Sequence, residues 1–211
     1  MFDFKIPEGK FDLYIDVGLS HNAPHSKKVL AANPNVFVIG IEPNPESCKS
    51  IRSFHIPESF DRFALVPYGI ANVDKMEYRK FNVTIPDPGT SSFLNITQHF
   101  RDSQNVSVSK VIDVPIVSLR HILDCVPWEK FNSTTFEMKS DTQGYECEVL
   151  KSLGDYIYKL NNIMIENSTG GQYKNAAQKE EIHKILEDSG MVLVRDEPAP
   201  NQGGDSWFVR K

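Results

Sequence analysis

A lysine and two acids follow one apolar segment of the chain at short spacing. In FEMKSDTQGYECEVLKS (136–152), an apolar run ends directly before Lys139, and Asp141 and Glu146 follow. Charges beside a buried strand are costly unless they are paired or used in chemistry. Asp141 is suited to act as a general base, and Lys139 to stabilise a developing alkoxide. The structural alternative is that Asp141 caps the next helix and that Lys139 pairs with Glu146.

Two earlier apolar segments also end in polar residues. Segment 11–17 ends at Asp16 and is followed by Gly18, and segment 36–42 ends at Glu42, followed by Pro43. Gly18 permits a tight turn with close backbone approach. The spacing from Gly18 to Glu42 suits a carboxylate that accepts hydrogen bonds from ribose hydroxyls. Both observations predict a nucleoside-containing ligand.

The loop after the first segment indicates which chemical group the nucleoside-containing ligand carries. DVGLSHNAPHS (16–26) has one glycine, so the G-x-G-x-x-G phosphate cradle is absent. Asp16 would repel a phosphate and attract an ammonium group. A ligand with a ribose and a charged amino-acid end fits better than a pyrophosphate. S-adenosylmethionine is such a ligand, and it is the predicted cofactor.

Strand-like and helix-like patterns alternate along the chain and would position these residues. Repeated βα units of this kind predict an α/β fold with a mostly parallel sheet and helices on both faces. The last two strands have no room for a helix between them and should form a hairpin, which leaves one antiparallel strand. The predicted strands span 11–17, 36–42, 63–72, 134–140, 162–167, 191–196 and 205–211, and the predicted helices span 26–33, 45–54, 144–158 and 175–189.

Segment 73–133 breaks the alternation. It contains strand-like stretches and a polar loop, and it is predicted to be an insertion with its own β ribbon near the carboxyl ends of the strands. Its polar turn Thr90–Ser92 and its His99 are candidates to face the acceptor, and His99 is a candidate catalytic residue. The alternative for a lone loop histidine is that it is only solvated. Residues 1–211 are predicted to form a single domain with this insertion as a lid.

Composition excludes several classes of protein. The net charge is −5 with no Lys/Arg block, so no nucleic-acid partner is expected. No apolar run is long enough to span a bilayer, and the N-terminus lacks the pattern of a signal peptide. Three widely spaced cysteines indicate reduced thiols and a cytoplasmic location. The oligomeric state stays open, with a homo-oligomer among the alternatives.

Four stretches resemble, in order and spacing, the motifs of the FkbM family of class I S-adenosylmethionine-dependent methyltransferases. They are YIDVGLSHNAPHS (14–26), VFVIGIEPNP (36–45), VPIVSLRHIL (114–123) and FEMKSDTQGYECEVLKSL (136–153). The most specific element is K-x-D-x-[QE]-G-x-E at 139–146. The resemblance implies a Rossmann-like sheet of seven strands with the last strand antiparallel, and O-methyl transfer to sugars or natural products.

The resemblance also assigns residues to the cofactor. It places Asp16, Gly18 and Glu42 on cofactor-binding positions. It implies further contacts from the first loop at the amino-acid end of the cofactor, and from a segment that flanks the adenine. These residues are Ser20, His21 and Asn22 in the loop, Pro43 after the second strand, and Ile70, Ala71 and Asn72 in the flanking segment.

A metal site is a separate hypothesis. Asp141, Glu166 and Asn167 follow two predicted strands and offer hard oxygen ligands of the kind that Mg²⁺ or Ca²⁺ prefers. The arrangement resembles metal-dependent catechol-type methyltransferases. A divalent cation there would hold two neighbouring hydroxyls and lower the pKa of one.

The predicted function is an O-methyltransferase that acts on a sugar hydroxyl or a related small polyol. One alternative is a nucleoside-binding or assembly module of the same fold without activity, which the single-glycine loop leaves open. Another is a nicotinamide-dependent oxidoreductase, against which the missing phosphate cradle argues.

Overall fold

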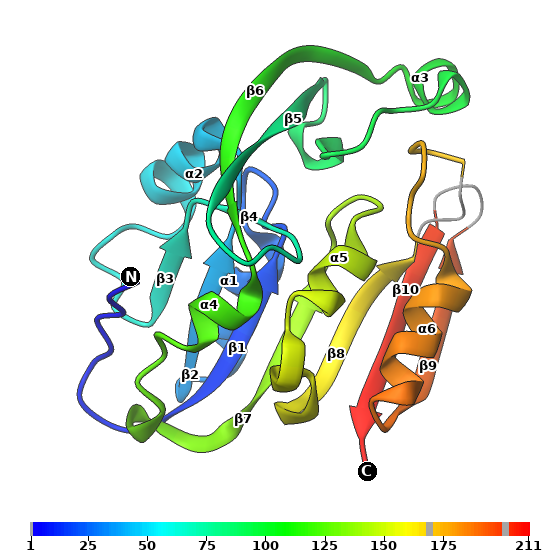
Figure 1. Ribbon diagram of the computed structural model, residues 1–211. Helices are drawn as coiled ribbons and strands as arrows, with labels where there is room; N and C mark the ends of the chain where they lie inside the picture. Colours follow the sequence, from blue (N-terminus) through cyan, green and yellow to red (C-terminus); the bar gives the residue numbers. More distant parts are fainter. Residues whose placement is uncertain (1, 168–170, 200–202) are drawn as a thin grey trace.

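A seven-stranded sheet forms the centre of the protein (Figure 1). The computed structural model describes residues 2–167, 171–199 and 203–211. The strand order is β3-β2-β1-β7-β8-β10-β9. The strands are β1 (Phe11–Val17), β2 (Val36–Ile41), β3 (Phe63–Val66), β7 (Phe131–Ser140), β8 (Leu160–Asn167), β9 (Met191–Ala199) and β10 (Gly203–Arg210).

Strand directions follow the predicted pattern. β1 pairs in parallel with both β2 and β7, β2 pairs in parallel with β3, and β7 with β8. β10 lies between β8 and β9 and is antiparallel to both. The predicted Rossmann-like fold with an antiparallel last strand is confirmed. The strand order reverses beside β1, and ligands of such sheets bind at this switch point, outside the carboxyl ends of the strands.

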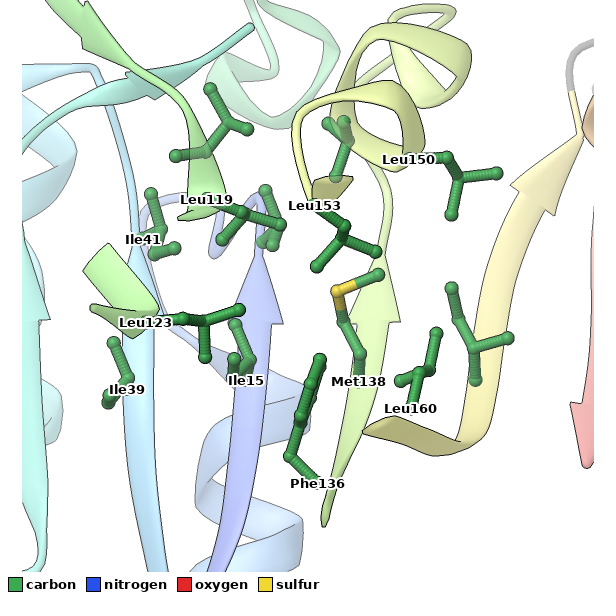
Figure 2. Close-up of a cluster of buried hydrophobic side chains, with 14 of the residues drawn as sticks. Ile15, Ile39, Ile41, Leu119, Leu123, Phe136, Met138, Leu150, Leu153 and Leu160 are labelled. Carbon is green, nitrogen blue, oxygen red and sulfur yellow. The ribbon is translucent and has the colours of Figure 1, made fainter. Parts of the chain in front are cut away.

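The two faces of the sheet are covered by different helices. α4 (Leu119–Leu123), α5 (Glu146–Lys151) and α6 (Lys179–Asp188) pack on one face. Figure 2 shows the core beneath them, where Ile15, Met138 and Leu119 are among the buried side chains. α1 (Pro24–Ala32) and the π-helical turn η1 (Ile51–His55) cover the opposite face of β1 and β2, through side chains such as Leu30 and Ile51. α2 (Pro45–Ser50) precedes η1.

β5 and β6 lie in the segment predicted to be an insertion, and together with β4 they form a second, smaller sheet. Its strand order is β4-β6-β5, from β4 (Gly69–Ile70), β5 (Glu77–Ile85) and β6 (Ser107–Val117). The β5–β6 connection carries the short 3-10 turn η2 (Pro88–Thr90) and α3 (Gln98–Gln104). In Figure 1 this ribbon arches above the carboxyl ends of the main strands. The turns η3 (Trp128–Lys130) and η4 (Gly154–Lys159) precede β7 and β8.

Several element boundaries differ from the sequence prediction. The strand expected over 63–72 breaks at Pro67, which has no N–H to donate, and Tyr68 N bonds Val66 O in a turn. Its second part, β4, joins the other sheet. The helix expected over 144–158 divides into α5 and η4 where Gly154 takes a positive φ of 54°.

The remaining helix predictions had the right place and the wrong length. The helix predicted over 26–33 is α1, which begins two residues earlier, and the one over 45–54 is α2 followed by η1. The helix predicted over 175–189 begins only at Lys179, because the preceding residues pack on the α5 loop, with Ala177 N bonded to Gly144 O. Within the described residues, no helix has the length and apolar character that a membrane crossing requires.

Candidate functional site

One pocket lies at the carboxyl ends of β1, β2 and β7, where the strand order reverses. It contains about 560 Å³ of empty space, its open mouth included. Its floor comes from the strand ends and its roof from the second sheet. The lining residues are Val17, Gly18, Ser20, Ile41, Glu42, Pro43, Tyr68, Gly69, Ile70, Asp141, Thr142, Gln143 and Tyr145, with Phe81, Pro88, Gly89, Ser91 and Phe93 from the insertion.

Gly18 brings the first loop into direct contact with the segment after β7. Its φ is +83°, and an added Cβ would lie 1.9 Å from the carbonyl oxygen of Asp141. Asp141 N donates to Val17 O at 3.0 Å, which holds the two segments together. Only glycine fits there, as predicted. Glycine at position 18 is therefore required by the close contact between these two segments of the protein.

Lys139 joins three groups around this loop. Its Nζ donates to Gly18 O at 2.6 Å and lies 3.5 Å from Asp16 Oδ1 and 3.3 Å from Asp141 Oδ2. Burial alone would lower the pKa of Lys139, but the carboxylates of Asp141 and Asp16 outweigh burial and raise it. The side chain therefore stays charged and positions the loop. The predicted Lys139–Glu146 pair is wrong.

Asp16 lies behind the pocket and not in its wall. It is 1% exposed, and its Oδ2 accepts a hydrogen bond of 2.6 Å from Ser26 Oγ on α1. Its cationic partner is Lys139 of the same chain. The prediction that Asp16 receives the ammonium of a ligand is therefore replaced by a positioning role beneath the first loop.

Asp141 presents a carboxylate to the pocket. Its side chain is 37% exposed, and Oδ1 accepts a 2.8 Å hydrogen bond from Gln143 Nε2. Burial pushes the pKa of Asp141 up, but Lys139 and the hydrogen-bond donors around it bring the pKa below its usual value. It does not cap the next helix, whose N-cap residue is Tyr145. An ionised carboxylate that faces a pocket is able to accept a proton.

Glu42 lines the far end of the same pocket. It is 5% exposed, and its Oε1 accepts a 2.8 Å hydrogen bond from Asn44 N. Burial raises the pKa of Glu42 to about 7, although the Asn44 amide and Lys139 act in the opposite direction. The carboxyl group is thus fixed in place with hydrogen-bonding capacity left for a ligand.

Glu146 closes the turn after β7. Its Oε1 accepts from Thr142 N at 2.8 Å, from Thr142 Oγ1 at 3.0 Å and from Gly144 N at 3.3 Å. Its burial raises its pKa to about 7. The last acid of the K-x-D-x-[QE]-G-x-E motif therefore holds the shape of the loop that carries Asp141.

The metal-ligand set of Asp141, Glu166 and Asn167 does not assemble. Gln143 Nε2 bridges the first two carboxyl groups, at 2.8 Å to Asp141 and 2.9 Å to Glu166. Asn167 is the next residue along β8 and points to the opposite face, where its Nδ2 donates to Ser206 Oγ at 2.6 Å. Across the described part of the chain, no group of three or more His, Cys, Asp and Glu is arranged to hold a metal ion. The predicted divalent cation has no support from this geometry.

The other predicted residues divide into two sets. Ser20, Pro43 and Ile70 line the pocket, whereas His21, Asn22, Ala71 and Asn72 do not. His99 is exposed on α3 beside Gly171, away from the pocket lining, so the geometry gives no support to its predicted catalytic part.

The sequence prediction missed part of the pocket. Gln143 occupies a defined position of the 139–146 motif, and that position was a signal that could have identified it. Phe81, Phe93 and Tyr145 carried no such signal, because apolar aromatic residues look the same in a core and in a pocket wall.

The reversed strand order, the glycine at the first turn and a pocket lined by both Glu42 and Asp141 are typical of a Rossmann-like domain that binds a nucleoside-containing ligand. The family model described as the methyltransferase FkbM domain matches residues 18–193. The chain therefore belongs to the FkbM methyltransferase family. A search of curated proteins finds no match.

Two solved structures of low sequence identity share the fold. Precorrin-6y C5,15-methyltransferase from Geobacter metallireducens has 12% identity and a TM-score of 0.50, with 98% of this chain and 85% of that chain covered. Aeropyrum pernix fibrillarin, with natively bound S-adenosyl-L-methionine, has 11% identity and a TM-score of 0.50, with 97% and 69% covered. The pyocyanin biosynthetic protein PhzM has 13% identity and a TM-score of 0.46, with 97% of this chain covered. This chain spans about half the length of that protein, at 52%.

Proposed function

We propose that this protein is an O-methyltransferase that acts on a hydroxyl group of a sugar or a related small polyol. The observation that carries the proposal is one pocket that is lined by both Glu42 and the ionised carboxylate of Asp141. In this proposal residues 1–211 form one catalytic domain. Its three unpaired thiols, Cys48, Cys125 and Cys147, suit the cytoplasm.

The proposed cofactor contacts follow the floor of the pocket. Glu42 accepts hydrogen bonds from the ribose hydroxyls, and Ile70 packs against the base. The backbone at Gly18 and Ser20 lies beside the amino-acid end, held there by Lys139. S-adenosylmethionine supplies an electrophilic methyl group when bound.

Asp141 is the proposed general base. It lies on the pocket wall, and Lys139 and Gln143 hold its two carboxylate oxygens, which leaves it oriented before an acceptor arrives. Transfer of a methyl group to a hydroxyl oxygen requires removal of the hydroxyl proton, and Asp141 Oδ2 or Oδ1 receives it. Lys139 stabilises the carboxylate and not an alkoxide, because its ammonium is already engaged beneath the loop.

A neutral polyol suits the acceptor side. Ser91 lines the pocket and offers a hydroxyl group to acceptor hydroxyls. Tyr145 offers aromatic surface for the apolar face of a sugar ring. Whether the protein forms a homo-oligomer is tested by measuring its mass in solution.

The test is a calorimetric titration with S-adenosylhomocysteine, with Mg²⁺ and again with EDTA. We expect micromolar binding under both conditions. Turnover is then assayed on a panel of sugars and polyols, with the Asp141→Asn variant as control. Absence of binding under both conditions would remove the basis of the proposal. Binding without turnover on any acceptor would favour the inactive nucleoside-binding module.

A further inference from the structure

Phe93 contacts two other aromatic rings at the pocket. Phe93 lies between Phe81 of β5 and Tyr145 before α5, with ring centroids 5.0 Å and 5.2 Å away. Phe81 is buried, at 4% exposure, whereas Phe93 is only partly buried and lines the pocket. Phe93 therefore presents aromatic surface to whatever fills the pocket.

Phe93 lies directly on the backbone that precedes Ile70. A Cβ added to Gly69 would be 2.3 Å from Phe93 Cζ and 2.8 Å from Cε2. Glycine at this position is thus required for the ring to approach. The contact places Phe93 beside Gly69, which precedes Ile70 in the pocket lining.

The ring of Tyr145 is held in this cluster by Arg79 of β5, which also forms an ion pair with Glu77. Arg79 Nη1 donates to Tyr145 OH at 2.5 Å, and Arg79 Nε donates to Glu77 Oε1 at 3.0 Å. Tyr145 is thereby fixed against Phe93. A flat apolar surface that is rigid before a ligand binds loses little entropy on binding.

We infer that Phe93 is a cofactor-binding residue and that the adenine base stacks on its ring. The inference rests on the proposed function, since it requires a nucleoside in this pocket. Every base has a π-face, and stacking on an aromatic side chain is a strong contact for it. Glu42 on the ribose and Phe93 on the base would then fix the nucleoside at two points, one from the main sheet and one from the insertion.

The experiment compares two ligands on three proteins by calorimetric titration. The ligands are S-adenosylhomocysteine and 5′-deoxy-5′-methylthioadenosine, which lacks the amino-acid end. The proteins are the wild type, Phe93→Leu and Tyr78→Ala. Leucine keeps the apolar volume without the π-face. Tyr78 lies on the same strand as Phe81 and is 65% exposed outside the pocket.

We expect Phe93→Leu to bind both ligands about tenfold more weakly, and Tyr78→Ala to bind them within about twofold of the wild type. Equal or tighter binding by Phe93→Leu would overturn the inference, since the ring would then be outside the base site or would fill it. Weakening for S-adenosylhomocysteine alone would also overturn it, because the ring would face the amino-acid end. Failure of the wild type to bind either ligand would refute the proposed function itself.

Discussion

Replacement of Gly18 by alanine should damage the fold and the cofactor site together. Two costs combine. The first is the left-handed backbone at φ +83°, which costs an alanine about 1–2 kcal/mol. The second is overlap, because the new Cβ would lie 1.9 Å from Asp141 O, although real Cβ atoms essentially never come within 3.0 Å of another heavy atom.

The overlap forces the two segments apart by about 1 Å. That shift strains the 3.0 Å bond from Asp141 N to Val17 O and the 2.6 Å bond from Lys139 Nζ to Gly18 O. A neutral hydrogen bond contributes about 1 kcal/mol and one to a charged group about 2 kcal/mol. With the backbone cost, the free energy of unfolding should fall by about 4 kcal/mol.

Urea unfolding measures this loss, and Gly190→Ala is the matched control. Gly190 has nearly the same φ, +86°, but an added Cβ would meet only the end of Arg210, at 3.4 Å. The control should therefore lose only the backbone cost, about 1–2 kcal/mol. Equal losses in the two variants would refute the reasoning, since the clash with Asp141 would then contribute nothing.

Substitutions of three further residues test the charges of the site. Lys139→Met leaves two carboxylates without their shared cation, so urea unfolding should show a loss of about 3 kcal/mol, and an unchanged midpoint would contradict this. Affinity for S-adenosylhomocysteine, measured by calorimetry, should rise as pH rises through about 7, the pKa of Glu42, because the ionised carboxylate accepts hydrogen bonds from the ribose hydroxyls. In Glu42→Gln this dependence of affinity on pH should be flattened. Without ligand the sign is opposite, because the stability that protonated Glu42 contributes is present below about pH 4.5 and is lost as pH rises through 7. Glu146→Ala should lower the free energy of thermal unfolding by about 2–3 kcal/mol, because the hydrogen bonds to Oε1 are lost. Glu146→Gln keeps the Oε1 acceptor and should lose under half of that. Similar losses in the two variants would count against the loop-closing role of Glu146.

Strand ends were predictable from sequence because apolar runs followed by polar residues mark them directly. Gly18, Glu42 and Asp141 were predicted on that basis, and all three line one pocket. The chain sections that carry them are far apart in sequence, but parallel strands bring their carboxyl ends to one edge. Position in a βα unit is therefore enough to place such residues.

Side-chain direction was not predictable in the same way. Asn167 follows Glu166 by one residue, and successive side chains of a strand lie on opposite faces of the sheet. The Asn167 side chain therefore lies on the other face and does not join Asp141 and Glu166 in the predicted metal site. Asp16 was predicted as a ligand contact, yet its partner is Lys139, from a strand more than a hundred residues later. Such pairings depend on tertiary contacts that no local pattern encodes.

The roof was the least predictable part of the site. Phe93 reaches Gly69 only because the insertion folds back over the strand ends, where the neighbouring Ser92 forms a backbone bridge with Asn82 of β5. The polar turn at Thr90–Ser92 was predicted to face a ligand, and within it Ser91 lines the pocket.

The place of β10 in the sheet bears on how the chain is synthesised. β10 (Gly203–Arg210) is an interior strand, with β8 on one side and β9 on the other. While residues 203–210 are still inside the ribosome, β8 has an unpaired edge and β9 has no strand to pair with. The sheet is therefore completed only after release of this segment, and chaperones that shield open strand edges would matter most in that interval.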